Sequence, residues 1–185
     1  MRGTNRDHGR LRKHLTEAEL QKLLSVINDN ECALRDRGLL LVGFHRGLRV
    51  SELVDLTWQD VDLEEGLVLC RRLKRGRNTV QKLLPIELDV LKELRTRYPD
   101  ETFVFPSSRG GKMSRYNVNR LLREAGKKAG VQVCNPHALR HGCGYALAMR
   151  GVDTRRLQRH LGLKSLEVAA TYTDLAEGAI HDIWS

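Results

Sequence analysis

The sequence predicts an α+β domain, mostly helical, with one small antiparallel β-sheet or hairpin. Apolar residues recur at helical spacing over most of the chain, as in the stretch from Leu20 to Ile27. The stretch between Trp58 and Ile86 changes to short β-type runs around a turn cluster. There is no internal repeat or low-complexity run, so we expect one domain over residues 14–185 after a basic arm at 1–13.

Caps and breaks define the elements expected in the first half of the chain. Thr16 and Glu19 form a capping box, which predicts a helix over 16–28. A second, leucine-rich helix is expected from about Cys32 to a break at Gly47, and a short helix follows over 50–56. The runs 67–69 and 79–80 then flank the cluster 74–78, which predicts a hairpin with a basic tip.

The second half is predicted to be helical apart from one loop. Helical spacing resumes at Leu88 and stops before Pro99, and a short extended piece at 103–106 leads into a Gly-rich basic loop at 107–112. Further helices are expected over 114–129, 136–149, 153–161 and 165–172. Pro136 suits the first turn of its helix, where its missing N–H is not needed.

The charge balance favours a polyanionic partner. Of 185 residues, 32 are Lys or Arg and 23 are Asp or Glu, which gives a net charge of +9, while 41% are hydrophobic. A folded basic domain of this kind attracts duplex DNA first and an anionic membrane surface second. No apolar run approaches the roughly 18 residues of a membrane span, and the charged N-terminus does not match a signal peptide, so we expect a cytoplasmic protein.

The four cysteines give no sign of a metal or disulfide framework. Cys32, Cys70, Cys134 and Cys143 are scattered without a C-x-x-C pair. We therefore expect reduced thiols, no metal site and no cofactor.

Three short patterns are candidates for chemistry. Arg49 follows the break at Gly47 and precedes Glu52, and His137 and Arg140 stand three apart on one helix face, about 5–6 Å from each other. The His–Arg pair can present a proton donor and a bidentate phosphate ligand to one oxyanion. Each pattern alone is also ordinary, since an Arg–carboxylate pair is a common structural device. The third pattern is Tyr172 on a late apolar helix, where a lone tyrosine is usually part of the core.

Taken in order, these patterns resemble the tyrosine recombinases, also called phage integrases. The similar segments are GLRVSELVDLTWQDVDLEEG, NPHALRHGCGYALAMRG and TRRLQRHLGLKSLEVAATYTDL. The resemblance runs from about His14 onward and corresponds to that family's catalytic domain. With no separate core-binding domain expected before it, the chain looks most like the small recombinases that invert fimbrial promoter segments.

The resemblance implies a role for each of five residues. Arg49 and Arg140 match the arginines that clamp the scissile phosphate, and Lys74 matches the lysine that protonates the departing 5′ oxygen. His137 matches the acid/base position. Tyr172 matches the nucleophile, which forms a 3′-phosphotyrosyl bond, and the reaction implied needs neither metal nor ATP.

One position departs from the family pattern. The family normally has L-G-H before the tyrosine, with a histidine that donates to the scissile phosphate, and here the triplet ends in Leu163. His160, one helical turn earlier, is the candidate to supply the missing donor. Its alternative role is a contact with solvent or with the DNA backbone.

DNA contacts are expected from two basic stretches. Those on the hairpin are Arg72, Arg75 and Arg77, and those on the 114–129 helix are Arg115, Asn119 and Arg120. The partners implied are double-stranded DNA, further copies of this chain with four in the synaptic complex, and DNA-bending accessory proteins. The apolar tail at 176–185 is expected either to dock into a neighbouring copy or to fold back on its own core.

The function expected is site-specific recombination through Tyr172. Its outcome is either inversion of a promoter segment or integration and excision of a mobile element. A DNA-binding regulator of the same fold, with catalysis impaired by Leu163, is the alternative. A monomeric strand-nicking topoisomerase is a third hypothesis. It would religate a single duplex, whereas a recombinase exchanges strands between two sites.

Overall fold

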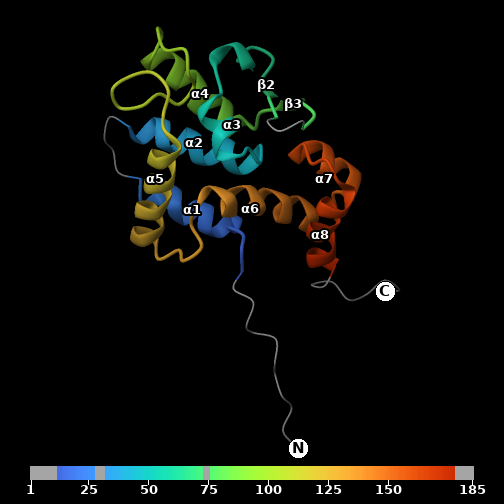
Figure 1. The fold of residues 1–185 in the computed structure, drawn as a ribbon. Helices are drawn as coiled ribbons and strands as arrows, with labels where there is room; N and C mark the ends of the chain where they lie inside the picture. Colours follow the sequence, from blue (N-terminus) through green and yellow to red (C-terminus); the bar gives the residue numbers. More distant parts are fainter. Residues whose placement is uncertain (1–11, 28–31, 73–75, 178–185) are drawn as a thin grey trace, which may run out of the picture.

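Most of the chain is helical and a small sheet lies at one edge in the computed structural model, which describes residues 12–27, 32–72 and 76–177 (Figure 1). The helices of this part of the chain are α1 (Glu17–Ser25), α2 (Ala33–His45), α3 (Val50–Val54), α4 (Pro85–Arg97), α5 (Arg115–Ala129), α6 (Pro136–Met149), α7 (Thr154–Leu161) and α8 (Leu166–Glu177), with a 3₁₀ turn at Trp58–Asp60. The predicted α+β class is confirmed. Within the described ranges, every helix is too short or too polar to cross a membrane.

Side-chain caps fix where the helices begin. The Thr16 hydroxyl accepts a hydrogen bond from the Glu19 N–H at 3.2 Å, and the Glu19 carboxylate accepts one from the Thr16 N–H at 2.9 Å. Asn135 caps α6 in the same manner through the Ala138 N–H, with Pro136 in the first turn. The helices expected from these signals are therefore present, within a few residues of the expected bounds.

The sheet has three antiparallel strands in the order β1 (Val61–Asp62), β2 (Leu67–Cys70) and β3 (Thr79–Lys82). Cys70 pairs with Thr79 and Leu67 with Lys82, which confirms the hairpin. Strand β1 adds a two-residue edge through Val61 and Val68, too short to be predicted from alternation of apolar and polar residues. Residues 73–75 at the hairpin tip lie outside the described ranges.

Helix α6 joins two hydrophobic clusters. The larger cluster lies among α1 to α5 and includes Phe44, Leu91 and Leu139, the last from α6 itself. The smaller cluster lies among α6, α7 and α8 and consists of Cys143, Ala148, Leu157, Leu161, Ala169, Tyr172 and Ala176. Figure 1 shows α6 running across the middle of the molecule with α7 and α8 at one end. Side chains from α6 can therefore meet groups from both halves.

Helix α8 extends beyond its predicted end. The sequence predicts a helix that stops at about Tyr172, whereas the helix continues to Glu177. Ala169, Tyr172 and Ala176 are all buried, at the i, i+3 and i+7 spacing of one helix face. Tyr172 therefore lies within a packed helix and not at its frayed end.

Gly47 allows the corner between α2 and α3 to approach α6 and α7 closely. Its φ is 56°, in the left-handed region that side chains disfavour. A Cβ at this position would lie 2.4 Å from Leu161 Cδ2 and 3.1 Å from Cys143 Sγ. The corner is therefore specified both by backbone conformation and by lack of space.

We predict that Gly47→Ala lowers the free energy of unfolding by about 2–3 kcal/mol, since it combines left-handed strain with overpacking. Gly151→Ala is the matched control, because Gly151 also has positive φ (73°) but nothing lies within 4 Å of its Cβ position. Chemical denaturation of both variants measures the difference. Equal losses would show that the contact with Leu161 contributes nothing.

Candidate active site

A buried carboxylate holds three guanidinium groups together. Glu52 of α3 accepts hydrogen bonds from Arg49 Nη1 at 2.7 Å and from Arg72 Nη1 at 3.0 Å, and Arg140 Nη1 lies 3.9 Å from it. The Glu52 side chain is fully buried. We call Arg49, Glu52, Arg72 and Arg140 the Glu52 cluster. It unites the two arginines that were predicted as phosphate ligands, which are 91 positions apart in the sequence.

The charges of the cluster keep Glu52 ionised. Burial alone would raise the pKa of its carboxyl, but the hydrogen bonds from the backbone and side chain of Arg49, together with the charge of Arg72, lower the pKa below its usual value. Glu52 was not among the site residues predicted. Its position three residues after Arg49, on the first turn of a helix, is the signal that locates it.

Arg72 lies inside the protein, and its prediction as a DNA contact does not fit this position. Its side chain is completely buried, and its guanidinium donates to Glu52 and to the carbonyl oxygens of Arg46, Gly47 and His160. The reason is strand alternation: burial alternates along β2 and beyond it, with Val68, Cys70 and Arg72 on the inner face. Arg72 therefore binds the Glu52 cluster to the sheet.

Arg140 forms hydrogen bonds near the C-terminal ends of α2 and α7. Its guanidinium donates to the carbonyl oxygens of Gly47 and Leu161, and burial, followed by the charges of Arg49 and Arg72, lowers its pKa to about 10. Arg49 is different, because its side chain stays 34% exposed. Arg49 thus gives the cluster its most accessible guanidinium.

Tyr172 is packed against α6 and hydrogen-bonded there. The residue is only 5% exposed, and its hydroxyl lies 2.8 Å from Nδ1 of His141. Burial raises the pKa of the phenol, while the charges of Arg140 and Arg49 act in the opposite direction. Tyr172, the predicted nucleophile, thus lies close enough to both arginines for their charges to oppose the rise in its pKa.

His137 and His141 stand one helical turn apart on α6. Their rings meet edge to face with centroids 4.4 Å apart, and His137 is exposed. His141 was not predicted as a site residue, although its spacing of four from His137 places both on one face. Of the two histidines, His141 contacts Tyr172 directly.

His160 does not replace the donor that Leu163 lacks. Its Nε2 lies 2.8 Å from the carbonyl oxygen of His45, which can only accept, so Nε2 carries the hydrogen and is used inside the protein. Burial lowers the pKa of His160 to about 4. The expectation that His160 supplies the donor therefore does not fit this position, since α7 turns its Nε2 inward. The residue is part-buried, and its contact with solvent or DNA stays a prediction. Leu163 itself is half-buried against the smaller hydrophobic cluster.

Exposed cations surround Leu163 from two elements. A cavity of about 560 Å³ is lined by Leu163 together with Arg77 from the hairpin and Arg155, Arg159 and Lys164 from α7 and the turn after it. Arg77 is exposed, as a DNA contact would require. Lys74 and Arg75, predicted as proton donor and DNA contact, lie outside the described residues.

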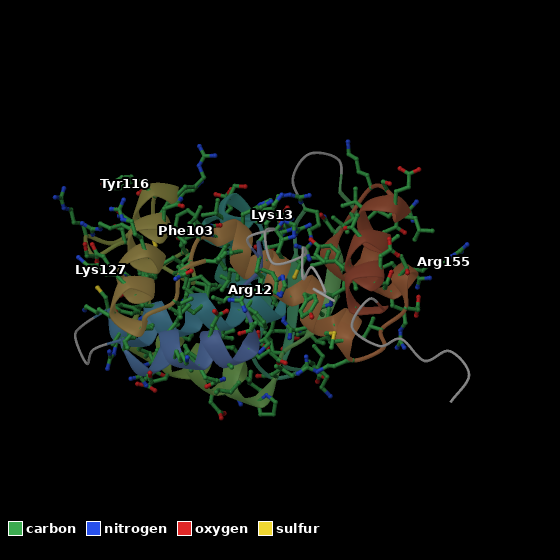
Figure 2. All side chains as sticks on the ribbon, turned by 90° about the horizontal axis from the view of Figure 1, so that it is seen from below. Arg12, Lys13, Phe103, Tyr116, Lys127 and Arg155 are labelled. Atoms are coloured by element: carbon green, nitrogen blue, oxygen red, sulfur yellow. The ribbon has the colours of Figure 1, made fainter. Side chains whose placement is uncertain are left out.

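The three DNA-contact residues predicted on α5 are all exposed. Arg115 and Arg120 present their side chains to solvent, and Arg120 faces Glu124 at 4.0 Å. Asn119 donates its amide to the Arg115 carbonyl at 2.9 Å. Figure 2 shows Tyr116 and Lys127 at the α5 end of the molecule and Arg155 at the opposite end. The positive surface is thus distributed over the length of the domain.

The described residues contain no group of three or more His, Cys, Asp or Glu side chains arranged to hold a metal ion. The four cysteines are all free thiols. Burial raises the pKa of Cys143 to about 12 and that of Cys134 to about 11, which disfavours the reactive thiolate form of both.

The family is established by comparison with known proteins. Residues 13–178 match the model of the phage integrase family. The chain therefore belongs to this family, and it is a tyrosine recombinase, which confirms the prediction from sequence.

Relatives and solved structures agree with this assignment. The chain is 37% identical to the type 1 fimbriae regulatory protein FimE of Escherichia coli over 180 residues, which covers 94% of this chain and 91% of FimE. It is 38% identical to the tyrosine recombinase XerA of Pyrococcus furiosus over 167 residues, covering 88% of this chain and 57% of XerA. A crystal structure of XerA recombinase superimposes with a TM-score of 0.80 at 27% identity, covering 92% of this chain and 63% of the XerA chain.

We predict that Glu52→Gln lowers the free energy of unfolding by about 3–5 kcal/mol at pH 7, because three guanidinium groups lose their buried counter-charge. The pKa of Glu52 is lower in the folded protein than its usual value of 4.5, so its stabilising effect is complete above pH 4.5 and is lost as the pH falls through the folded pKa. The difference between wild type and variant should therefore shrink below pH 4.5.

Denaturation at pH 7 and at pH 3.5 measures this difference. Glu93→Gln is the control, since Glu93 forms an exposed pair with Arg97 on α4 and should change the stability by less than about 1 kcal/mol. A difference between wild type and Glu52→Gln that is independent of pH would contradict the assignment.

Proposed function

We propose that this recombinase cleaves and rejoins DNA through Tyr172, with Arg49 and Arg140 as ligands of the scissile phosphate. The observation that carries the proposal is the grouping of both arginines around Glu52, with the phenol of Tyr172 close enough for their charges to act on it. A phosphodiester gains negative charge on its nonbridging oxygens during attack. Fixed guanidinium donors lower the barrier because they interact most strongly at that stage.

The proposed reaction exchanges one phosphodiester for another. The Tyr172 oxygen attacks phosphorus, the bond from phosphorus to the 5′ oxygen breaks, and a 3′-phosphotyrosyl bond forms. The phenolic proton leaves with His137 or solvent as acceptor, and Lys74 protonates the departing 5′ oxygen, as the resemblance to the family implies. A 5′ hydroxyl of a second strand then attacks the same phosphorus and releases the tyrosine.

The proposed outcome is inversion of a DNA segment. It is supported by similarity over nearly the whole chain to FimE and to FimB, a second type 1 fimbriae regulatory protein, which is 36% identical over 97% of this chain. The proposed partners are duplex DNA, four copies of the chain in the synaptic complex, and DNA-bending proteins. A structure of the XerH site-specific recombinase bound to its difH substrate, with a TM-score of 0.74 at 25% identity, supports DNA as a partner of this fold.

Contacts with the DNA backbone are proposed from exposed cations and from the polar side chain of Asn119. Arg77 and its neighbours in the cavity around Leu163 form one group, and Arg115, Asn119 and Arg120 on α5 form another. Both groups leave their charges accessible to phosphates, unlike Arg72.

We expect Tyr172→Phe to abolish covalent attachment to DNA while leaving DNA affinity unchanged, because only the nucleophilic oxygen is lost. The measurement incubates wild type and variant with nicked duplexes made from DNA flanking the gene, and detects protein that stays attached to a 3′ end in denaturant. Adduct formation by the variant would refute the assignment. Joining of strands between two duplexes, as opposed to resealing of one, distinguishes recombination from strand nicking.

Leu163 is the observation that favours the alternative function, a DNA-binding regulator with impaired catalysis. We predict that Leu163→His increases the rate of cleavage by about 10²–10³-fold, the usual effect of one hydrogen-bond donor to a transition-state oxyanion. Rates of adduct formation on the nicked duplex test this, with Leu163→Ala as a control for loss of the leucine alone, since alanine adds no donor. An unchanged rate in the histidine variant would show that another group already supplies the donor.

A further inference from the structure

The hydroxyl of Tyr172 has a partner that its expected chemistry leaves unused. The phenol oxygen lies 2.8 Å from Nδ1 of His141, and the two rings are tilted at 46° with centroids 5.6 Å apart. His141 comes directly after Arg140 in α6 and is half-buried. The expected acid/base residue, His137, contacts the ring of His141.

We propose that His141 is a positioning residue that holds the Tyr172 oxygen in place for attack. This inference rests on the proposed function of Tyr172 as nucleophile. In it, Nδ1 accepts the hydrogen bond of the phenol and so holds the oxygen in position before DNA binds. Without this anchor the ring would lose one of its two attachments to α6, and the oxygen would move with the ring.

The second attachment is the contact between the tyrosine ring and Gly144. A Cβ at position 144 would lie 2.6 Å from Cε1, 2.8 Å from Cδ1 and 2.9 Å from Cζ of Tyr172. The ring therefore packs directly on the backbone of α6, one turn after Arg140. His141 at the hydroxyl and Gly144 at the ring together define the seat of Tyr172.

The protonation states suit a hydrogen bond from the phenol to the imidazole. Burial raises the pKa of Tyr172, so the phenol keeps its hydrogen at neutral pH. Burial and nearby positive groups lower the pKa of His141 to about 4, so its ring is neutral and offers a lone pair. The groups that face it are His137 and Arg140 from α6 itself, Lys13 and His14 from the segment before α1, and Tyr172 from α8.

Two substitutions at His141 separate the hydrogen bond from the packing. His141→Asn keeps an acceptor, since the side-chain oxygen of Asn takes nearly the place of Nδ1, but it loses the ring. His141→Phe keeps a ring of similar shape but has no acceptor. A structural role of the ring predicts that the Phe variant is active and the Asn variant is not, whereas the proposal predicts the reverse.

The experiment measures the single-turnover rate of adduct formation and the affinity for the same nicked duplex. We expect the rate to fall about 10–100-fold in His141→Phe and by less than about threefold in His141→Asn, with unchanged affinity in both. Tyr145→Phe is the matched control, because Tyr145 lies on the same helix and its ring stacks on His14. A normal rate in the Phe variant, or an equal loss in both variants, would overturn the proposal.

Gly144→Ala tests the seat without any requirement for catalysis. Displacement of the ring should make Tyr172 more reactive toward nitration in the free protein, with the 68% exposed Tyr116 as internal reference. Unchanged nitration of Tyr172 would overturn the seat. If wild-type protein formed no adduct at all, the proposed function would fail, while the nitration result would still report on the seat.

Discussion

The site depends on one buried carboxylate, Glu52. Three guanidinium groups converge on it from three separate parts of the chain, the start of α3, the strand that leads into the hairpin, and α6. Removal of a charge from water costs several kcal/mol, and three like charges at close range repel one another. A single ionised carboxylate offsets both effects because hydrogen bonds and charges from Arg49 and Arg72 keep its proton off. The arrangement is thus fixed before any anion arrives, which is the condition for electrostatic stabilisation of a transition state.

The three arginines of the Glu52 cluster differ in burial and in hydrogen-bond partners, and these differences indicate different roles. Arg72 is buried and directs its guanidinium to Glu52 and to backbone carbonyl oxygens, so its function is internal. Arg140 is buried, and burial lowers its pKa because a positive charge is less stable away from water. A phosphate beside it would relieve that cost. Arg49 remains the most accessible of the three, at the N-terminus of a helix that begins where Gly47 breaks the chain.

Local signals in the sequence predicted the fold well, because they act over a few residues. The capping box at Thr16 and the proline at 136 mark helix starts that the structure reproduces. Contacts across the fold were harder to predict. The inward direction of His160 depends on the carbonyl of His45, which lies 115 positions earlier, and no local pattern reports it. The burial of Arg72 was predictable in principle from alternation along the strand.

The order of motifs predicted Arg49, Arg140 and Tyr172 as one site, and the fold brings them together. It did not single out His141, because the spacing of four from His137 shows a shared helix face but does not show that this face meets Tyr172. The partner of Tyr172 is decided by how α8 packs on α6, which is a property of the smaller hydrophobic cluster as a whole.

The guanidinium groups of Arg72 and Arg140 also bind carbonyl oxygens at the ends of helices. This limits the substitutions that evolution can accept at these two positions. Between them they bind the carbonyl oxygens of Arg46 and Gly47 after α2, and of His160 and Leu161 at the end of α7. Lysine would preserve the charge but not the fork of donors that reaches two carbonyl groups at once. A lineage that abandoned catalysis would therefore still be held to arginine at these positions by folding alone. The presence of Arg72 and Arg140 is thus weak evidence that a protein of this fold is still an active enzyme. The presence of the tyrosine hydroxyl is stronger evidence.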